Sequence, residues 1–175
     1  MVGLLMLLRG NAAGAACFAP TREAALRSFR VAILCAPMFL VARLIARPEE
    51  ASARFLTAEI TGFVASWPAY ALAALVLCRF MGREALWPRW IAVWNWTNLA
   101  QYILMVTLLA FGLLVPEGWV LEAGSLMVIG YVLWLQWFSA RAALEVTGFQ
   151  AAAFVMLDLM VSLLLSGVVA DLSRG

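Results

Sequence analysis

The sequence contains no histidine and no lysine, and only 13% of its 175 residues are charged. Without histidine the chain lacks the commonest general base and metal ligand of proteins. Its net charge is only +2 and its arginines form no basic stripe, which argues against nucleic acid as a partner. It also lacks the P-loop, G-x-G-x-x-G, H-E-x-x-H and G-x-S-x-G patterns. We therefore expect neither an enzyme nor a bound cofactor or metal.

Cysteine is scarce as well, and no two cysteines form a C-x-x-C pair. The three are Cys17, Cys35 and Cys78, of which the last two fall in apolar runs. An odd number of cysteines cannot all pair within one chain. We interpret them as buried thiols.

Hydrophobic residues are abundant, at 66% of the chain, whereas a soluble domain has about 45–50%. A chain this small exposes too much surface to hide that excess in a water-soluble core. Five segments are long enough to cross a bilayer core of about 30 Å: residues 26–46, 58–80, 88–114, 119–142 and 149–172. The predicted fold is all-α, a polytopic transmembrane bundle of about five helices.

Local signals refine the ends of these helices. Thr21, after a proline, is a plausible start for the first, and the second is expected to extend back toward Ser52. Pro37 and Pro68 lie inside helices and are expected to kink them. Gly148 is expected to end the fourth helix and turn the chain into the fifth.

Residues 1–25 precede the bundle of residues 26–172. Their apolar run is interrupted by Arg9 and Asn11 and has no basic residue before it, so we do not expect a cleaved signal peptide. We predict an amphipathic helix lying on the membrane surface. The connections at 47–50, 81–84 and 116–118 are short, so successive helices are expected to be antiparallel neighbours.

The arginines predict an orientation. With a cytoplasmic N-terminus, the cytoplasmic side holds Arg9, Arg22, Arg27, Arg30, Arg79, Arg83, Arg89 and Arg141, and the other side holds Arg43, Arg47, Arg54 and Arg174. The positive-inside rule then favours a cytoplasmic N-terminus and a periplasmic C-terminus. Aromatic residues near helix ends, where an interfacial belt is expected, are Trp87, Trp90, Trp119 and Trp137.

Asp158 is the strongest functional candidate, because it lies near the middle of the last apolar segment. A charge at that depth is costly, so such residues usually face the bundle interior and find a partner. Gln150, Asp158, Ser162 and Ser166 recur at multiples of four and are expected to share one helix face.

The third predicted helix has a polar face of its own, with Asn95, Asn98 and Tyr102 in line and Gln101 at its edge. A rise of about 1.5 Å per residue places Asn98 and Asp158 at similar depth. A hydrogen bond between them is therefore our first hypothesis. Two roles stay open for this cluster: interhelical hydrogen bonding that holds the bundle together, or a proton, ion or substrate site.

Arg43 and Glu59 flank the first connection at similar depth, and we predict a structural ion pair between helices one and two. Gln136, near the inner end of the fourth helix, is interpreted as ordinary interface polarity.

Residues 128–167 contain an aromatic helix (Tyr131-Val132-Leu133-Trp134-Leu135-Gln136-Trp137) that leads through Ala142-Ala143-Leu144-Glu145-Val146-Thr147-Gly148 into a last apolar helix. In this stretch the chain resembles the bacterial branch of the Yip1-like family. The stretch from Arg9-Gly10-Asn11 to Arg27-Ser28-Phe29 resembles the amphipathic lead-in of other proteobacterial membrane proteins. The resemblance implies a five-helix protein of the bacterial inner membrane with a cytoplasmic N-terminus. No functional residue is carried over from it.

Two functions follow as hypotheses. The first is a non-enzymatic membrane scaffold or accessory subunit, which would have the lipid bilayer and other membrane proteins, or further copies of itself, as partners. The second is a small oligomeric transporter or channel that uses Asp158 with Asn98 and Gln101, supported by their matched depth.

Overall fold

The computed structural model describes residues 1–47, 52–115 and 118–174, and within these it contains helices and no strand. The elements are α1 (Val2–Leu8), η1 (Ala12–Cys17), α2 (Arg22–Ser28), α3 (Val31–Ala46), α4 (Ala53–Phe80), η3 (Glu84–Leu86), α5 (Trp87–Leu114), α6 (Trp119–Leu144) and α7 (Gly148–Arg174). Of the connections predicted at 47–50 and 116–118, residues 48–50 and 116–117 lie outside the described residues.

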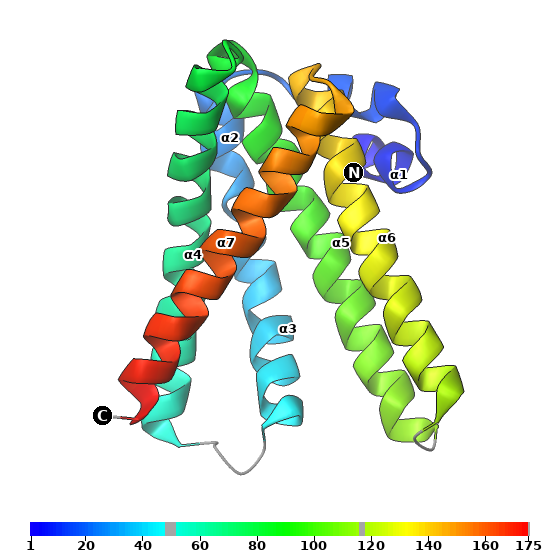
Figure 1. Cartoon of the computed structure of the whole chain (residues 1–175), viewed down its shortest axis with the longest axis vertical. Helices are drawn as coiled ribbons and strands as arrows, with labels where there is room; N and C mark the ends of the chain where they lie inside the picture. Colours follow the sequence, from blue (N-terminus) through cyan, green and yellow to red (C-terminus); the bar gives the residue numbers. More distant parts are fainter. Residues whose placement is uncertain (48–51, 116–117, 175) are drawn as a thin grey trace.

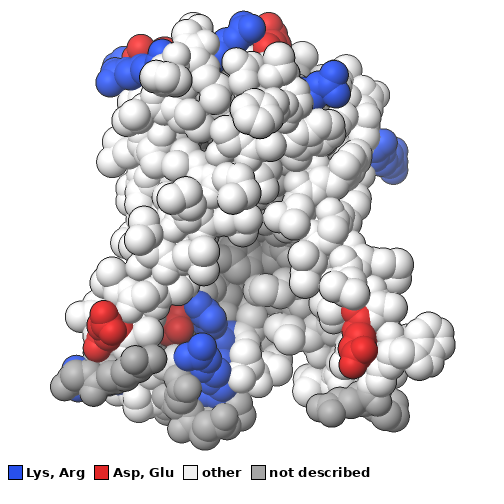
Figure 2. All heavy atoms as spheres, viewed as in Figure 1, with Lys and Arg blue, Asp and Glu red and all other residues white. Residues whose placement is uncertain are grey.

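Five stretches of helix are long and apolar enough to cross a membrane: Arg22–Ala46, Ala53–Phe80, Glu84–Leu114, Trp119–Leu144 and Gly148–Leu172. The predicted all-α bundle is thereby confirmed. Figure 2 shows charged side chains toward the two ends of the molecule, with an uncharged band between them. A lipid-facing surface has this distribution, because charged groups are costly in the hydrocarbon layer.

Hydroxyl caps start two helices near the positions that the sequence predicts. Thr21 Oγ1 accepts a hydrogen bond from the Ala24 N–H at 3.2 Å, and Ser52 Oγ accepts one from the Phe55 N–H at 3.1 Å. Each bond satisfies a backbone donor that has no partner inside its own helix. Both helices therefore begin several residues before the apolar cores at 26 and 58.

The first membrane-crossing stretch is broken between α2 and α3, before the expected kink at Pro37. The Ser28 hydroxyl donates to the Ala25 carbonyl at 2.6 Å, while the Phe29 and Arg30 N–H groups bond to carbonyls three residues back. These shorter hydrogen bonds tighten the backbone and interrupt the α-helical pattern. Pro37 and Pro68 lie inside α3 and α4.

The turn between α6 and α7 corrects the role expected for Gly148. The residue in the left-handed conformation is Glu145, with φ 55° and ψ 46°, and Gly148 is the first residue of α7. Thr147 and Gln150 cap that helix reciprocally: the Gln150 N–H donates to Thr147 Oγ1 at 3.3 Å, and the Thr147 N–H donates to Gln150 Oε1 at 3.0 Å. Gln150 therefore serves the helix start and does not extend the polar face of Asp158.

The long helices are arranged as two diverging groups (Figure 1). α7 packs along α4, and α6 packs along α5, while α2 and α3 pack on α5. The helices meet at the end that carries the α4–α5 and α6–α7 connections, here called the closed end. At the opposite end, here called the open end, the α4–α7 pair diverges from the α5–α6 pair. The C-terminus lies at the open end.

Aromatic side chains fill the core toward the closed end. The rings of Tyr70 and Trp94 stack with centroids 4.2 Å apart, and Trp90 lies edge-on to Phe154 at 5.9 Å. Trp90 is fully buried, so its assignment to an interfacial belt is wrong. The helices come close enough here to enclose the ring, and position along a helix alone does not reveal which face is covered.

The N-terminal segment folds back onto α6 at the closed end. α1 and η1 both contact α6, and the Tyr131 hydroxyl donates to the Leu8 carbonyl at 2.7 Å. Leu7 is fully buried, whereas Val2 and Leu5 are exposed. A helix is present in the predicted segment, but the residues of α1 are all apolar and its buried side lies against protein. Its position on a membrane surface stays a prediction.

The cysteines divide between core and surface. Cys35 and Cys78 are fully buried, as predicted, and Cys17 in η1 is exposed. The prediction of a buried thiol is wrong for Cys17, because η1 presents its last residue outward.

Candidate functional site

Asp158 pairs with Gln136 from the neighbouring helix. The Gln136 Nε2 donates to the Asp158 carboxylate at 2.7 Å, and Gln136 is only 2% exposed. The two earlier interpretations of this region are wrong: Gln136 is a buried partner and not interface polarity, and Asn98 does not bond to Asp158. Asn98 Nδ2 donates instead to the Trp94 carbonyl of its own helix at 2.9 Å.

The reason lies in how the helices pack. α6 and α7 are antiparallel neighbours joined by a tight turn. Gln136 lies eight residues before the end of α6 and Asp158 ten residues after the start of α7. At about 1.5 Å per residue these positions have similar depth. The long glutamine side chain reaches the carboxylate, whereas the shorter asparagine bonds back to its own backbone.

Three neighbouring cavities follow the polar side of α7, and Asp158 lines two of them. A small cavity of about 80 Å³ is lined by Ser66, Trp67, Trp94, Asn98, Tyr102, Asp158, Val161 and Ser162. A larger one of about 550 Å³ lies between α5, α6 and α7, and its polar lining is Asn98, Gln101, Tyr102, Asp158 and Ser162. A third, of about 210 Å³, lies between α3, α4 and α7. Tyr102 and Ser162 line all three, so the cavities meet around these side chains.

Four of the five residues proposed for the polar site therefore come together. Asp158, Asn98, Gln101 and Ser162 line one cavity. Asn95 does not join them, because it is fully buried and its Nδ2 donates to Ser28 Oγ at 2.6 Å. It links α5 to the end of α2 in the closed half of the bundle. The sequence put Asn95 on the same face as Asn98, but α2 and α3 cover its part of that face.

The predicted ion pair between Arg43 and Glu59 is present at 2.9 Å. Glu59 is 4% exposed, and the Arg43 guanidinium lies 5.3 Å from the centre of the Phe39 ring. Both charged residues line the 210 Å³ cavity together with Ser162 and Ser166. The sequence treated the ion pair and Asp158 as separate features, and the fold places them along one series of cavities.

The charge of Asp158 has no cationic partner on the described residues. Their ion pairs are Arg27–Glu23, Arg43–Glu59, Arg79–Glu84 and Arg89–Glu145. The Trp94 indole lies beside the carboxylate, and Trp94 Nε1 and Gln101 Nε2 are buried without a hydrogen-bond partner in the described structure. Gln136 thus donates to a carboxylate that no cation of the described residues neutralises, and Trp94 and Gln101 supply further donors to the cavities that it lines. No cluster of three or more metal-ligating side chains occurs among the residues searched.

Figure 2 shows that this face of the molecule is hollowed between the two groups of helices. The hollow widens toward the open end, where the α4–α7 and α5–α6 pairs diverge in Figure 1. The 550 Å³ cavity lies between α7 and the α5–α6 pair, so it occupies this region of the fold.

Sequence reasoning missed Gln136, Ser66 and Trp94 as members of the site. The pairing of Gln136 with Asp158 could have been predicted, since the two residues have similar depth on adjacent antiparallel helices. Nothing in the sequence marks Ser66 and Trp94 as members of the site. The crossing of the helices decides which residues of α4 and α5 face α7.

A comparison of the chain with protein-family models, curated proteins and solved structures found no match. The resemblance to the Yip1-like family therefore stays a prediction.

Proposed function

We propose that this chain is a non-enzymatic polytopic membrane protein that transports a small cation, a proton included, with Asp158 as its intramembrane binding group. The observation that carries the proposal is the Asp158 carboxylate, which has hydrogen-bond donors around it and no arginine paired with it in the described structure. A buried carboxylate is strongly unfavourable unless its charge is compensated. A bound cation or proton supplies that compensation.

The surroundings support a binding site better than simple interhelical hydrogen bonding. Interhelical hydrogen bonding requires only the Asp158–Gln136 contact between α6 and α7. The same carboxylate also lines cavities of about 80 and 550 Å³, with hydroxyl and amide groups of Tyr102, Ser162 and Gln101. Cavities with a few convergent polar groups are the usual form of small-molecule sites.

The closed end supports a specific conformational state. Tyr70, Trp90 and Phe154 are almost completely buried between the Asp158 level and the closed end. At the open end the helices diverge and the surface is hollowed between them. We interpret this arrangement as a state open on one side only, as alternating access requires. With the arginine distribution, the open side is the periplasmic side of a bacterial inner membrane and the N-terminus is cytoplasmic.

Proteoliposome transport tests the proposal. Purified protein is reconstituted, and the fluxes of protons and of radiolabelled methylammonium are measured against empty liposomes. We expect flux through the native protein and at least a tenfold loss in Asp158→Asn, because the neutral amide takes up no proton and carries no negative charge to attract a cation in the low-dielectric interior. Asp171→Asn is the matched control, since Asp171 is an exposed aspartate of the same helix.

Two results would overturn the proposal: no flux of either probe above that of empty liposomes, or equal loss of flux in Asp158→Asn and Asp171→Asn. Size-exclusion chromatography of each variant in detergent establishes that the loss does not come from misfolding.

A second candidate, the accessory subunit, is supported by the lateral position of the 550 Å³ cavity. Its wall includes the apolar side chains of Val128, Val132 and Leu133 on α6. A transmembrane helix of another protein, or of a second copy, has the chemistry to fill this space. Mild-detergent purification distinguishes the two roles: a stoichiometric hetero-complex that survives in Asp158→Asn favours the subunit.

A further inference from the structure

A second cavity, remote from Asp158, lies at the closed end of the bundle. It has a volume of about 370 Å³ and is formed by α2, α4, η3 and the first turn of α5. Its lining is Arg22, Ala25, Leu26, Phe29, Leu75, Arg79, Glu84, Trp87 and Pro88. It shares no lining residue with the three cavities along α7. This cavity is therefore separate from the site of Asp158.

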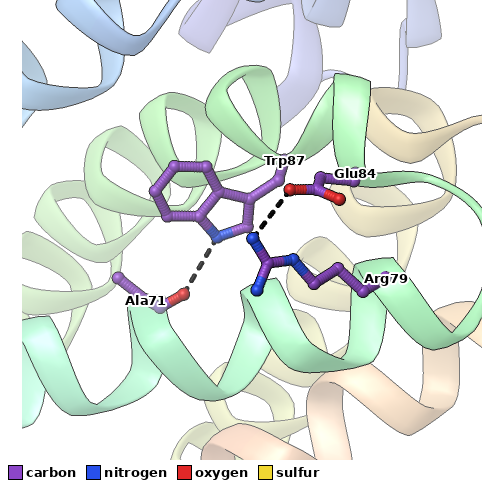
Figure 3. Close-up of polar contacts among 4 residues, drawn as sticks. All are labelled: Ala71, Arg79, Glu84 and Trp87. Carbon is purple, nitrogen blue, oxygen red and sulfur yellow. Dashed lines mark hydrogen bonds and ion pairs between the residues drawn. The ribbon is translucent and has the colours of Figure 1, made fainter.

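The floor of this cavity is apolar and fixed in place. Leu26, Phe29 and Leu75 supply aliphatic and aromatic surface from two helices. The Trp87 indole N–H donates to the Ala71 carbonyl at 2.9 Å (Figure 3), which holds the ring across the gap between α5 and α4. Leu26 is 71% exposed, so the apolar surface continues from the cavity onto the outside of α2.

The rim carries an excess of positive charge. Arg79 is already paired with Glu84 at 3.0 Å, as Figure 3 shows, and these two charges offset each other. Arg22 is exposed and forms no ion pair or side-chain hydrogen bond with the described residues. The cavity therefore presents two guanidinium groups and one carboxylate, with the charge of Arg22 uncompensated.

The position limits what can occupy such a cavity. It lies at the ends of membrane-crossing stretches that begin at Arg22 and Glu84 and end at Phe80. At this level lipid headgroups meet the acyl chains, and tryptophan and arginine are characteristic of it. Basic pockets between helices at this depth suit anionic headgroups. A guanidinium group also matches the geometry of phosphate oxygens.

We infer that this cavity binds one anionic phospholipid of the surrounding leaflet, with its phosphate between Arg22 and Arg79 and an acyl chain along Leu26 and Phe29. The free charge of Arg22 favours a headgroup of net negative charge over a zwitterionic one. A bound lipid here contacts α2, α4 and α5 together. It therefore links the segment just before the α2–α3 break to the rest of the bundle.

Native mass spectrometry of the detergent-solubilised full chain, titrated with phosphatidylglycerol, tests the inference. We expect one phosphatidylglycerol molecule to be retained at least tenfold more tightly than phosphatidylcholine. In Arg22→Gln, the preference for phosphatidylglycerol over phosphatidylcholine should fall by about tenfold. Arg30→Gln is the matched control, because Arg30 is also exposed, lies near the same end and does not line the cavity.

Leu75→Trp probes the floor without changing any charge, because the larger side chain fills the space that the acyl chain needs. It should also weaken phosphatidylglycerol retention. The inference is overturned by equal losses in Arg22→Gln and Arg30→Gln, which indicate general charge attraction. The inference is also overturned if the protein retains phosphatidylglycerol and phosphatidylethanolamine equally well. A third contrary result is that glycerol phosphate competes for the cavity as strongly as intact lipid does. Circular dichroism and size-exclusion profiles identical to the native protein establish folding of each variant.

Discussion

At the scale of single residues, Asp158 and Gln136 show how a polar contact inside a membrane is chosen. The bond joins two adjacent antiparallel helices, and each partner is at least partly buried. Hydrogen bonds between transmembrane helices are modest in strength, about 0.6 kcal/mol on average and up to about 1.7 kcal/mol. Such a bond positions the carboxylate more than it stabilises the bundle.

A double-mutant cycle measures this contact. We expect Gln136→Leu and Asp158→Leu to couple by about 0.5–1.5 kcal/mol in the free energy of unfolding, measured in mixed micelles. Asn98→Leu combined with Asp158→Leu should couple more weakly, because Asn98 bonds to the Trp94 carbonyl. Stronger coupling through Asn98 than through Gln136 would contradict the observed pairing.

At the scale of elements, α7 both lines the cavities and packs on α4. Its polar side lines the cavities through Asp158, Ser162 and Ser166. Toward the open end the same helix packs closely on α4, where a Cβ atom at Gly62 would lie 2.4 Å from Val169 Cγ2. This close approach of the two helices holds one wall of the 210 Å³ cavity, which both residues line.

Gly62→Ala tests that contact between elements. The added methyl group overlaps with Val169, whose branched side chain has little rotamer freedom in a helix. We expect a loss of about 1–3 kcal/mol in the free energy of unfolding. Val169→Ala in the same chain should restore most of it.

Gly130→Ala is the control within a helix, because nothing lies within 4 Å of a Cβ at that position. It should leave stability unchanged or raise it by up to about 1 kcal/mol, since alanine favours helix over glycine. Equal destabilisation by Gly62→Ala and Gly130→Ala would argue against a tight α4–α7 contact.

At the scale of the whole molecule, the bundle is asymmetric along its length. Trp90, Tyr70 and Phe154 form a solid aromatic core toward the closed end, whereas the helix pairs diverge at the other end. The polar cavities follow from this divergence, because helices that separate leave space that their own side chains do not fill. A cation transporter of the kind proposed must open the closed end in a later state.

Cysteine accessibility tests the asymmetry. In a chain with Cys17, Cys35 and Cys78 replaced by alanine, a charged methanethiosulfonate reagent is applied from the side of the C-terminus. Ser162→Cys and Ser166→Cys should react at least about tenfold faster than Ala74→Cys, which lies fully buried in the closed half. Similar rates at all three positions would show that the cavities are not open from that side.

Much of the fold follows from the sequence alone. Membrane-spanning stretches are recognisable because length and hydropathy are local properties. The ion pair of Arg43 and Glu59 was also predictable, since a short connection fixes the relative depth of its two flanking helices. Asp158 stood out because a charge in an apolar run is costly wherever the helix packs.

Only the tertiary structure decided which polar groups meet. Gln136 donates a hydrogen bond to Asp158, and Asn95 donates one to Ser28. The Arg43–Glu59 ion pair lines a cavity together with Ser162. These outcomes depend on how α7 packs on α6 and α4, and on how α2 packs on α5. Such crossing geometry arises from side-chain packing between residues far apart in the sequence, and it is not encoded in the period of any single helix.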